Sequence, residues 1–310
     1  MRRIILRILR ILRILMRRRN ITAGEGLPML NRLGNKSKLL PSLLPLFPAN
    51  VVTFIDMFAG SLAVSCAMLN RAKYVIANDA DRDVSNLYQV WRDRPAELAD
   101  ALEVVPYHSD VLRRFREQPE SDDIWRAVAF IYKSNFTFLS NTQTLKFGAG
   151  NSRQIALNAI RDGLAAINRI QFMSTDFRDA LNRIAWRHPR DTRSAFVYAD
   201  PPYINTDCAT YGAATWTETD TVDLFAMLSQ SGMRFAVSEF DGEFIRDLAA
   251  QYGLTVNTLG ERRNIANRKT EILITNYAPQ PQQASIFGLA GAQAGAGRDN
   301  AAKLYIGGGK

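Results

Sequence analysis

Short apolar runs rich in β-branched and aromatic residues recur along the middle of the chain, separated by segments with helical spacing. The runs expected to form strands are 51–56, 74–77, 169–176, 196–199, 234–240 and 271–277. The helices expected between the later runs lie at about 177–187, 220–231 and 243–252. Runs that are apolar on both faces are typical of parallel strands covered by helices. The alternation therefore predicts an α/β fold with a parallel-rich sheet.

Residues 85–165 break this alternation with charged and mainly helical sequence. Apolar positions recur at helical spacing in 90–105 and again in 122–136. The segment 136–154 that follows is rich in Asn, Thr, Ser, Gly and aromatic residues. We expect a mainly helical insertion here, with a polar loop suited to phosphate and base-edge contacts.

The two ends of the chain differ in composition from its middle. Residues 1–19 hold eight Arg and no acid, in an imperfect Arg-Ile-Leu repeat whose apolar runs are too short to cross a bilayer. We expect 1–29 to be a low-complexity leader that catalysis does not need. A helix for a membrane surface or a nucleic acid, and a mitochondrial-type address, stay open as alternatives. Residues 279–310 turn to Gln, Ala and Gly, which predicts a flexible tail.

The net charge of +9 over 310 residues suggests a nucleic-acid partner, but the leader accounts for most of it. Without residues 1–19 the chain has 31 basic and 30 acidic residues, so any DNA-binding surface must arise from local clustering. Cys66 and Cys208 are the only cysteines, which implies no disulfide framework and fits a reducing cytoplasm. His108 and His188 show no metal-ligand spacing, so no metal is expected.

The run at 196–199 stops abruptly at the tetrapeptide Asp200-Pro201-Pro202-Tyr203. Two consecutive prolines lack N–H groups and cannot continue a strand ladder, so Asp200 is expected at the carboxyl end of a buried strand. Open α/β sheets bind their ligands at that edge. The arrangement suits methylation of an exocyclic amine, in which the Asp200 carboxylate and the Pro201 carbonyl each accept one N–H. Tyr203 would then stack on the base.

A second candidate site follows the first strand. Gly60 allows a ligand to approach the N-terminus of the helix that is expected to begin near Leu62. Asp79 lies 19 residues after Gly60, at the end of the next strand. An acid at this spacing holds the ribose hydroxyls in dinucleotide-binding folds. Asp81 is the local alternative, and it is also a candidate helix cap.

Four blocks of sequence together resemble the DNA adenine methylase family. They are FIDMFAGSLAVS at 54–65, NDAD at 78–81, STDF at 174–177 and FVYADPPY at 196–203. The resemblance covers about residues 30–277 and implies a Rossmann-like methyltransferase sheet. It also implies an enzyme that transfers a methyl group from S-adenosylmethionine to N6 of adenine in DNA.

The resemblance assigns a role to each block. The implied catalytic residues are Asp200, Pro201, Pro202 and Tyr203, and the implied cofactor-binding residues are Lys36, Asp56, Phe58, Gly60, Asp79, Asp176 and Phe177. Lys36 or Lys38 would neutralise the methionine carboxylate. Phe177 would pack on the cofactor's adenine, with a place in the hydrophobic core as the alternative.

The resemblance also divides the chain into a catalytic domain, formed by 30–84 and 166–278, and a target-recognition insertion at 85–165. The candidate DNA contacts are Lys133, Asn135, Asn141, Gln143, Lys146 and Arg153. The expected partner is double-stranded DNA, with no membrane required, and the target adenine must be flipped out of the duplex. A cognate restriction endonuclease and the oligomeric state stay open. The alternatives are a cytosine N4 methyltransferase and a non-catalytic DNA-binding module of the same fold.

Overall fold

A seven-stranded mixed sheet forms the centre of the protein, with strand order β3-β2-β1-β4-β5-β7-β6. The computed structural model describes residues 36–137, 144–146, 152–203, 216–263 and 268–279. The strands are β1 (Val51–Asp56), β2 (Ala72–Asn78), β3 (Ile170–Met173), β4 (Ala195–Ala199), β5 (Arg234–Phe240), β6 (Thr255–Arg263) and β7 (Arg268–Thr275). The predicted leader and nearly all of the predicted tail lie outside the described residues. The described residues all belong to one compact unit of the chain.

The sheet is parallel from β3 through β5, and only β7 runs antiparallel to its neighbours β5 and β6. The prediction of a parallel-rich, Rossmann-like sheet is confirmed. The strand order reverses between β1 and β4, which pair at the centre of the sheet. In open α/β sheets such a switch point opens a crevice at the carboxyl ends of the strands, where ligands bind.

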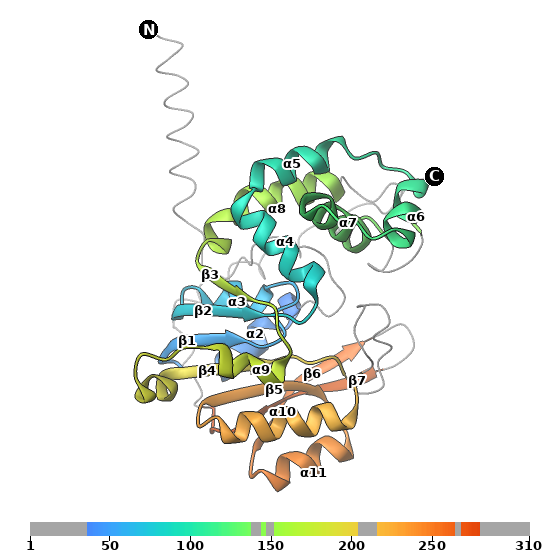
Figure 1. Ribbon diagram of the computed structural model, residues 1–310. Helices are drawn as coiled ribbons and strands as arrows, with labels where there is room; N and C mark the ends of the chain where they lie inside the picture. The colour runs from blue at the N-terminus through green and yellow to red at the C-terminus, as the bar shows by residue number, and fades with distance from the viewer. Residues whose placement is uncertain (1–35, 138–143, 147–151, 204–215, 264–267, 280–310) are drawn as a thin grey trace, which may run out of the picture. The chain divides into compact units, whose positions relative to one another are not determined.

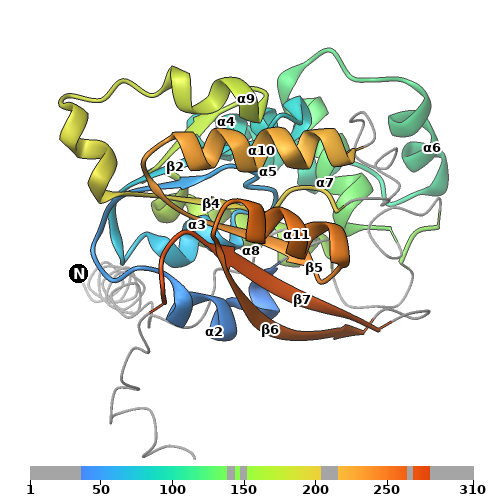
Figure 2. The ribbon, with the colours of Figure 1, turned by 90° about the horizontal axis from the view of Figure 1, so that it is seen from below.

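Helices cover both faces of the sheet, as the apolar strands require. Neighbouring residues of β1 enter different cores, since Phe54 belongs to one buried cluster and Ile55 to the other. The Ile55 side is covered by α10 (Glu218–Gln230) and α11 (Glu243–Gln251), which lie together on one side of the sheet (Figures 1 and 2). The Phe54 side is covered by short N-terminal elements and by α3 (Ala63–Met68).

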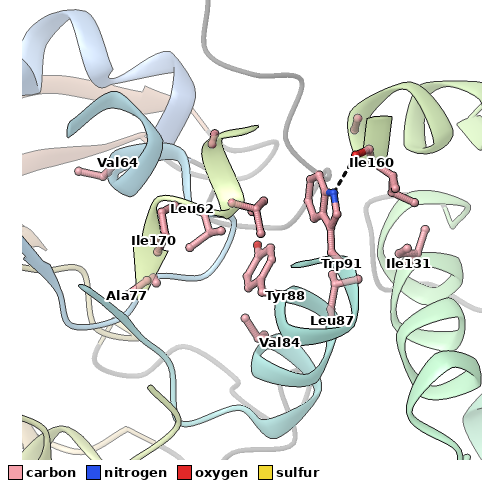
Figure 3. Close-up of a cluster of buried hydrophobic side chains, with 14 of the residues drawn as sticks. Leu62, Val64, Ala77, Val84, Leu87, Tyr88, Trp91, Ile131, Ile160 and Ile170 are labelled. Atoms are coloured by element: carbon pink, nitrogen blue, oxygen red, sulfur yellow. Dashed lines mark hydrogen bonds between the residues drawn. The ribbon is translucent and has the colours of Figure 1, made fainter. Parts of the chain in front are cut away.

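The stretch predicted as a helical insertion is helical. Its helices are α4 (Arg82–Asp93), α5 (Pro95–Val104), α6 (Ser109–Glu117), α7 (Asp123–Asn135) and α8 (Ser152–Ile167). Trp91 of α4 anchors this group, because its Nε1 donates to the Ile160 carbonyl of α8 at 2.8 Å (Figure 3). Gly163 permits the approach, since a Cβ there would lie 2.6 Å from the Trp91 ring. Among the described helices, none is both long and apolar enough to cross a membrane.

Three local predictions need correction. The edge strand β6 was not predicted, because its sequence TVNTLGERR is largely polar and lacks the apolar run of the inner strands. The helix predicted at 177–187 is shorter: α9 spans Phe177–Ala180 and a 3-10 turn follows at Leu181–Arg183. The chain then becomes extended at Ile184, which packs against the core beside Trp186. The third strand is also shorter than the predicted 169–176.

Candidate active site

Asp200 lies directly after β4, at the carboxyl edge of the sheet. Every residue of β4 is buried, and Pro201 and Pro202 end the strand as the sequence predicts. The Asp200 side chain is 16% exposed, so it lies close to the surface without being fully solvated. The strand thus carries a carboxylate to the switch point between β4 and β1.

Lys36 is the central contact of Asp200. It begins a 3-10 turn at Lys36–Lys38, and its side chain is only 4% exposed. Its Nζ lies 2.7 Å from Asp200 Oδ1 and 2.9 Å from Glu271 Oε1, on β7. One buried cation is therefore shared by two carboxylates that come from distant parts of the chain. The structure places the Lys36 ammonium beside Asp200 and Glu271, and its predicted contact with the cofactor's methionine carboxylate stays a prediction.

Tyr203 completes this cluster from the end of the turn. Its hydroxyl donates to Glu271 Oε1 at 2.9 Å and lies 3.3 Å from Asp200 Oδ1. It also contacts Lys36 Nζ. Its ring lies 4.1 Å from the Phe240 ring, centroid to centroid. The proposed stacking of Tyr203 on a base stays a prediction, and the structure fixes the hydroxyl end of the side chain.

Burial and the neighbouring charges have opposite effects on the pKa of Lys36. Burial alone would lower the pKa of Lys36, but the charges of Asp200 and Glu271 outweigh it and the pKa is raised. Glu239 of β5 is 3% exposed, and burial raises its pKa to about 8. Within the described part of the chain, Oε2 of Glu239 and Oε2 of Glu271 have no hydrogen-bond partner. A protonated Glu239 therefore limits the negative charge around a single cation.

The loop after β1 forms the second half of the site. Gly60 has φ +46°, and its N–H donates to Asp79 Oδ2 at 2.9 Å. A Cβ on Gly60 would meet only the Phe58 carbonyl, at 3.9 Å, so the space above the loop is not filled by the described side chains. Leu62 also has a positive φ, +59°, which is uncommon for a residue with a branched side chain. Asp79 thus forms a hydrogen bond to a strained loop, beside the unfilled space above Gly60.

Asp56 lies before this loop and contacts the helix that follows the loop. It ends β1, is 2% exposed, and its Oδ2 accepts a hydrogen bond from Ser65 Oγ at 2.6 Å. Burial raises its pKa to about 7, although the Ser65 hydrogen bond works against the shift. Asp56 therefore connects the end of β1 to the first turn of α3.

Three aromatic rings line the same region. Phe58 lies 5.8 Å from Phe177 and 5.5 Å from Trp216, and Phe177 lies 5.3 Å from Trp216. Phe177 is buried, in agreement with the alternative that it belongs to the core. Asp176 caps α9, where its Oδ1 accepts from Arg178 N at 2.9 Å. Its side chain is 54% exposed, so it remains accessible to a ligand.

Sequence reasoning missed Glu271 and Trp216. Glu271 stands in the apolar run EILIT, and an acid inside such a run was a signal of a buried charge. Trp216 directly follows residues 204–215, which lie outside the described residues. No spacing rule links either residue to its partners.

The predicted DNA contacts have varied surroundings. Lys133 Nζ lies 3.9 Å from Asp83 Oδ2, and Lys146 Nζ donates to the carbonyl of the buried Asn135 at 3.2 Å. Arg153 donates to the carbonyls of Glu103 and Val105, at the end of α5. Asn141 and Gln143 lie outside the described residues. Contact of these residues with DNA stays a prediction.

Known proteins similar to this chain are methylases and methyltransferases by name. The Modification methylase StsI of Streptococcus sanguinis is 28% identical over 281 residues, which cover 80% of this chain and 42% of that protein. The Type II methyltransferase M.FokI of Planomicrobium okeanokoites is 23% identical, with 80% and 42% covered. The chain spans about two-fifths of the length of these curated relatives.

Among solved structures, the precorrin-6y C5,15-methyltransferase from Geobacter metallireducens GS-15 aligns with a TM-score of 0.36 and 9% identity, covering 79% of this chain and 90% of that one. The family model for D12 class N6 adenine-specific DNA methyltransferases matches residues 33–265, about three-quarters of the sequence. The match includes Lys36, Gly60, Asp79 and Asp200, whereas Glu271 lies beyond its end. The chain therefore belongs to the family of D12 class N6 adenine-specific DNA methyltransferases.

Proposed function

We propose that this protein transfers a methyl group from S-adenosylmethionine to N6 of a flipped adenine in double-stranded DNA. The observation that carries the proposal is the position of Asp200. It is a nearly buried carboxylate at the switch point of the sheet, held by Lys36 at 2.7 Å. A carboxylate at that edge accepts N–H groups from an exocyclic amine, and the neighbouring strands offer a nucleoside site.

The residues after β1 and β2 fit S-adenosylmethionine. Asp79 accepts from the Gly60 N–H with Oδ2 and from the Asp81 N–H with Oδ1, and each oxygen has a further lone pair for a ribose hydroxyl. The positive φ of Gly60 and the open space above it admit a ligand close to the backbone. Phe58 and Trp216 offer apolar surface for an adenine ring. When bound, the cofactor supplies an electrophilic methyl group.

Asp200 and the Pro201 carbonyl would each accept one N–H of the target amino group. This favours a pyramidal nitrogen whose lone pair can form the new N–C bond. As the N–C bond forms, the bond between the methyl carbon and the sulfonium sulfur of S-adenosylmethionine would break, and its electron pair would stay on sulfur. The nitrogen would then lose one proton, for which the Asp200 carboxylate is the proposed acceptor. Lys36 positions that carboxylate, and Glu271 in turn positions both Lys36 and the Tyr203 hydroxyl.

The target base must leave the duplex, because adenine N6 is not accessible to in-line attack inside the helix. In this proposal Tyr203 replaces the lost stacking, and the helical region at 85–165 reads the site. DNA as substrate implies a cytoplasmic location. The names of the relatives, a modification methylase and a type II methyltransferase, support a role in restriction–modification.

Sequencing of modified bases in DNA from cells that express the full chain tests this proposal directly. We expect N6-methyladenine at one short sequence motif and none in cells with the Asp200→Ala variant. N4-methylcytosine would identify the rival reaction. Unmodified DNA, together with retained DNA binding in vitro, would favour the non-catalytic alternative.

A further inference from the structure

The hairpin formed by β6 and β7 concentrates positive charge at one end. Arg262 and Arg263 end β6, and Arg268 and Lys269 begin β7, whereas Glu261 is the only acid among residues 260–270. The remainder of the chain beyond the leader is almost neutral. This hairpin is therefore the kind of local basic cluster that DNA binding requires.

The register makes the clustering more pronounced. Arg262 pairs with Lys269, and Arg263 pairs with Arg268, so two successive cross-strand pairs carry like charges. The register therefore brings the backbone positions of four basic residues together at the same end of the two strands.

The charged end of the hairpin lies at the edge that carries Asp200. Phe240, the last residue of β5, pairs with Glu271 of β7. Arg268 is three residues before Glu271 in the sequence, which places it about 10 Å beyond the end of β5 at the usual rise of a strand. Figures 1 and 2 show β6 and β7 side by side at the margin of the sheet.

Contacts connect this end of the hairpin to the catalytic turn. The exposed Lys269 places its Nζ 5.0 Å from the centroid of the Phe240 ring. That ring in turn lies 4.1 Å from the Tyr203 ring, and the Tyr203 hydroxyl lies 3.3 Å from Asp200 Oδ1. A polyanion held by the hairpin would run beside the residue proposed to stack on the target base.

We propose that the basic end of the β6–β7 hairpin binds the phosphate backbone of duplex DNA beside the flipped adenine. The inference rests on the proposed function and adds a DNA-binding surface outside the 85–165 insertion. Arginine and lysine at this position bind phosphates without reading sequence. The hairpin therefore fixes the position of the duplex, and specificity comes from elsewhere.

The salt dependence of DNA affinity tests this inference. The full chain and its Arg268→Gln/Lys269→Gln variant are titrated with a fluorescent duplex of mixed sequence between 50 and 200 mM salt. Each lost phosphate contact should reduce the slope of log K against log salt by about 0.9. For two contacts, the affinity ratio of wild type to variant should fall about tenfold across this range. The leader is present in both proteins and contributes equally.

Lys73→Gln is the matched control. Lys73 is exposed near the amino end of β2, at the opposite edge of the sheet, and its Nζ lies 5.1 Å from the Tyr74 ring. Its removal should leave the slope unchanged, and Lys269→Arg should retain the wild-type slope. S-adenosylmethionine binding reports folding, and if the double variant does not fold, the two single variants carry the test.

The outcomes separate the inference from the proposed function. A wild-type chain that methylates no adenine contradicts the proposed function. A wild type that methylates adenine, with an unchanged slope in the double variant, overturns only the inference. An altered methylation motif in the variant also overturns it, because that result identifies base contacts.

Discussion

The two halves of the candidate site are held together in different ways. On the β1–β2 side, Gly60 and Asp79 are joined by a neutral backbone donor and a carboxylate only 19 residues away. On the β4–β7 side, Lys36, Asp200 and Glu271 form a buried ionic cluster from segments far apart in the sequence. The first half depends on local chain geometry, whereas the second depends on the whole fold being assembled.

This difference has a functional consequence. The loop after β1 is held by hydrogen bonds from neutral donors, including the Tyr88 hydroxyl on the Gly60 carbonyl at 2.6 Å, and such a loop can adjust to a cofactor that enters and leaves. A buried cation shared by two carboxylates resists movement, because separating the charges without water is costly. We infer that the cofactor side adapts while the side that holds the target amine is pre-organised.

Removal of the Lys36 cation should have the largest effect on the molecule. In Lys36→Met, Asp200 and Glu271 face each other without a cation between them. Breaking a buried pair by removing one partner costs about 3–5 kcal/mol. The free energy of unfolding, measured by denaturant titration, should fall by that amount.

Lys38→Met is the control, because Lys38 belongs to the same turn but is exposed. It should change the free energy of unfolding by no more than about 0.5 kcal/mol. Equal losses in both variants would mean that the turn, and not the buried cation, determines stability.

Asp200→Ala should have the second largest effect, and it should lower the rate of methyl transfer. Losing an acceptor aimed at the reacting group costs about 10²–10³ in kcat. S-adenosylmethionine affinity should change little, because Asp79 and Gly60 lie on the other half of the site. Single-turnover kinetics with calorimetric titration of the cofactor measures both quantities. Turnover close to that of the wild type would exclude Asp200 from the chemistry.

The same contrast explains how much the sequence could predict. The strands, the turn at Asp200 and the Gly60–Asp79 pair follow from local patterns, and the family match agrees with them. The contact of Lys36 with Asp200 was not predicted, because nothing local indicates that two residues 164 positions apart meet. Glu271 was missed for the same reason, since its partner Tyr203 lies 68 residues away. Contacts between distant segments depend on strand order, which periodicity does not specify.

Asp79→Ala should show the opposite profile to Asp200→Ala. Loss of a charged hydrogen-bond acceptor costs about 1.5–3 kcal/mol, which corresponds to a tenfold or greater loss of S-adenosylmethionine affinity. The rate at saturating cofactor should fall less. Isothermal titration measures the affinity, and unchanged binding would remove Asp79 from the ribose site.

Asp81→Ala is the matched control for that experiment. Asp81 caps α4, where its Oδ1 accepts from Asp83 N at 2.9 Å. Loss of this cap should reduce the free energy of unfolding by about 0.5–2 kcal/mol without lowering the affinity for S-adenosylmethionine. The pair of variants distinguishes ligand binding from helix capping within one short loop.

The smallest expected effect concerns the proton on Glu239. It tests whether this carboxyl group stays neutral beside the charged groups on the β4–β7 side. Burial raises the pKa of Glu239 from 4.5 to about 8, so between these values the folded protein holds a proton that the unfolded chain has lost. This contribution to stability is complete below pH 4.5 and is lost as pH rises towards 8. Glu239→Gln keeps a neutral side chain at every pH, so its stability relative to wild type should rise by about 1 kcal/mol from pH 6 to pH 7. Titration of other groups, including Asp56, cancels in this difference.

The exposed Glu243, at the start of α11, provides the control variant Glu243→Gln. Its difference in stability from wild type should stay constant between pH 6 and pH 7. A constant difference for Glu239→Gln as well would show that Glu239 ionises in the folded protein as it does in the unfolded chain, and that the cluster tolerates a third negative charge.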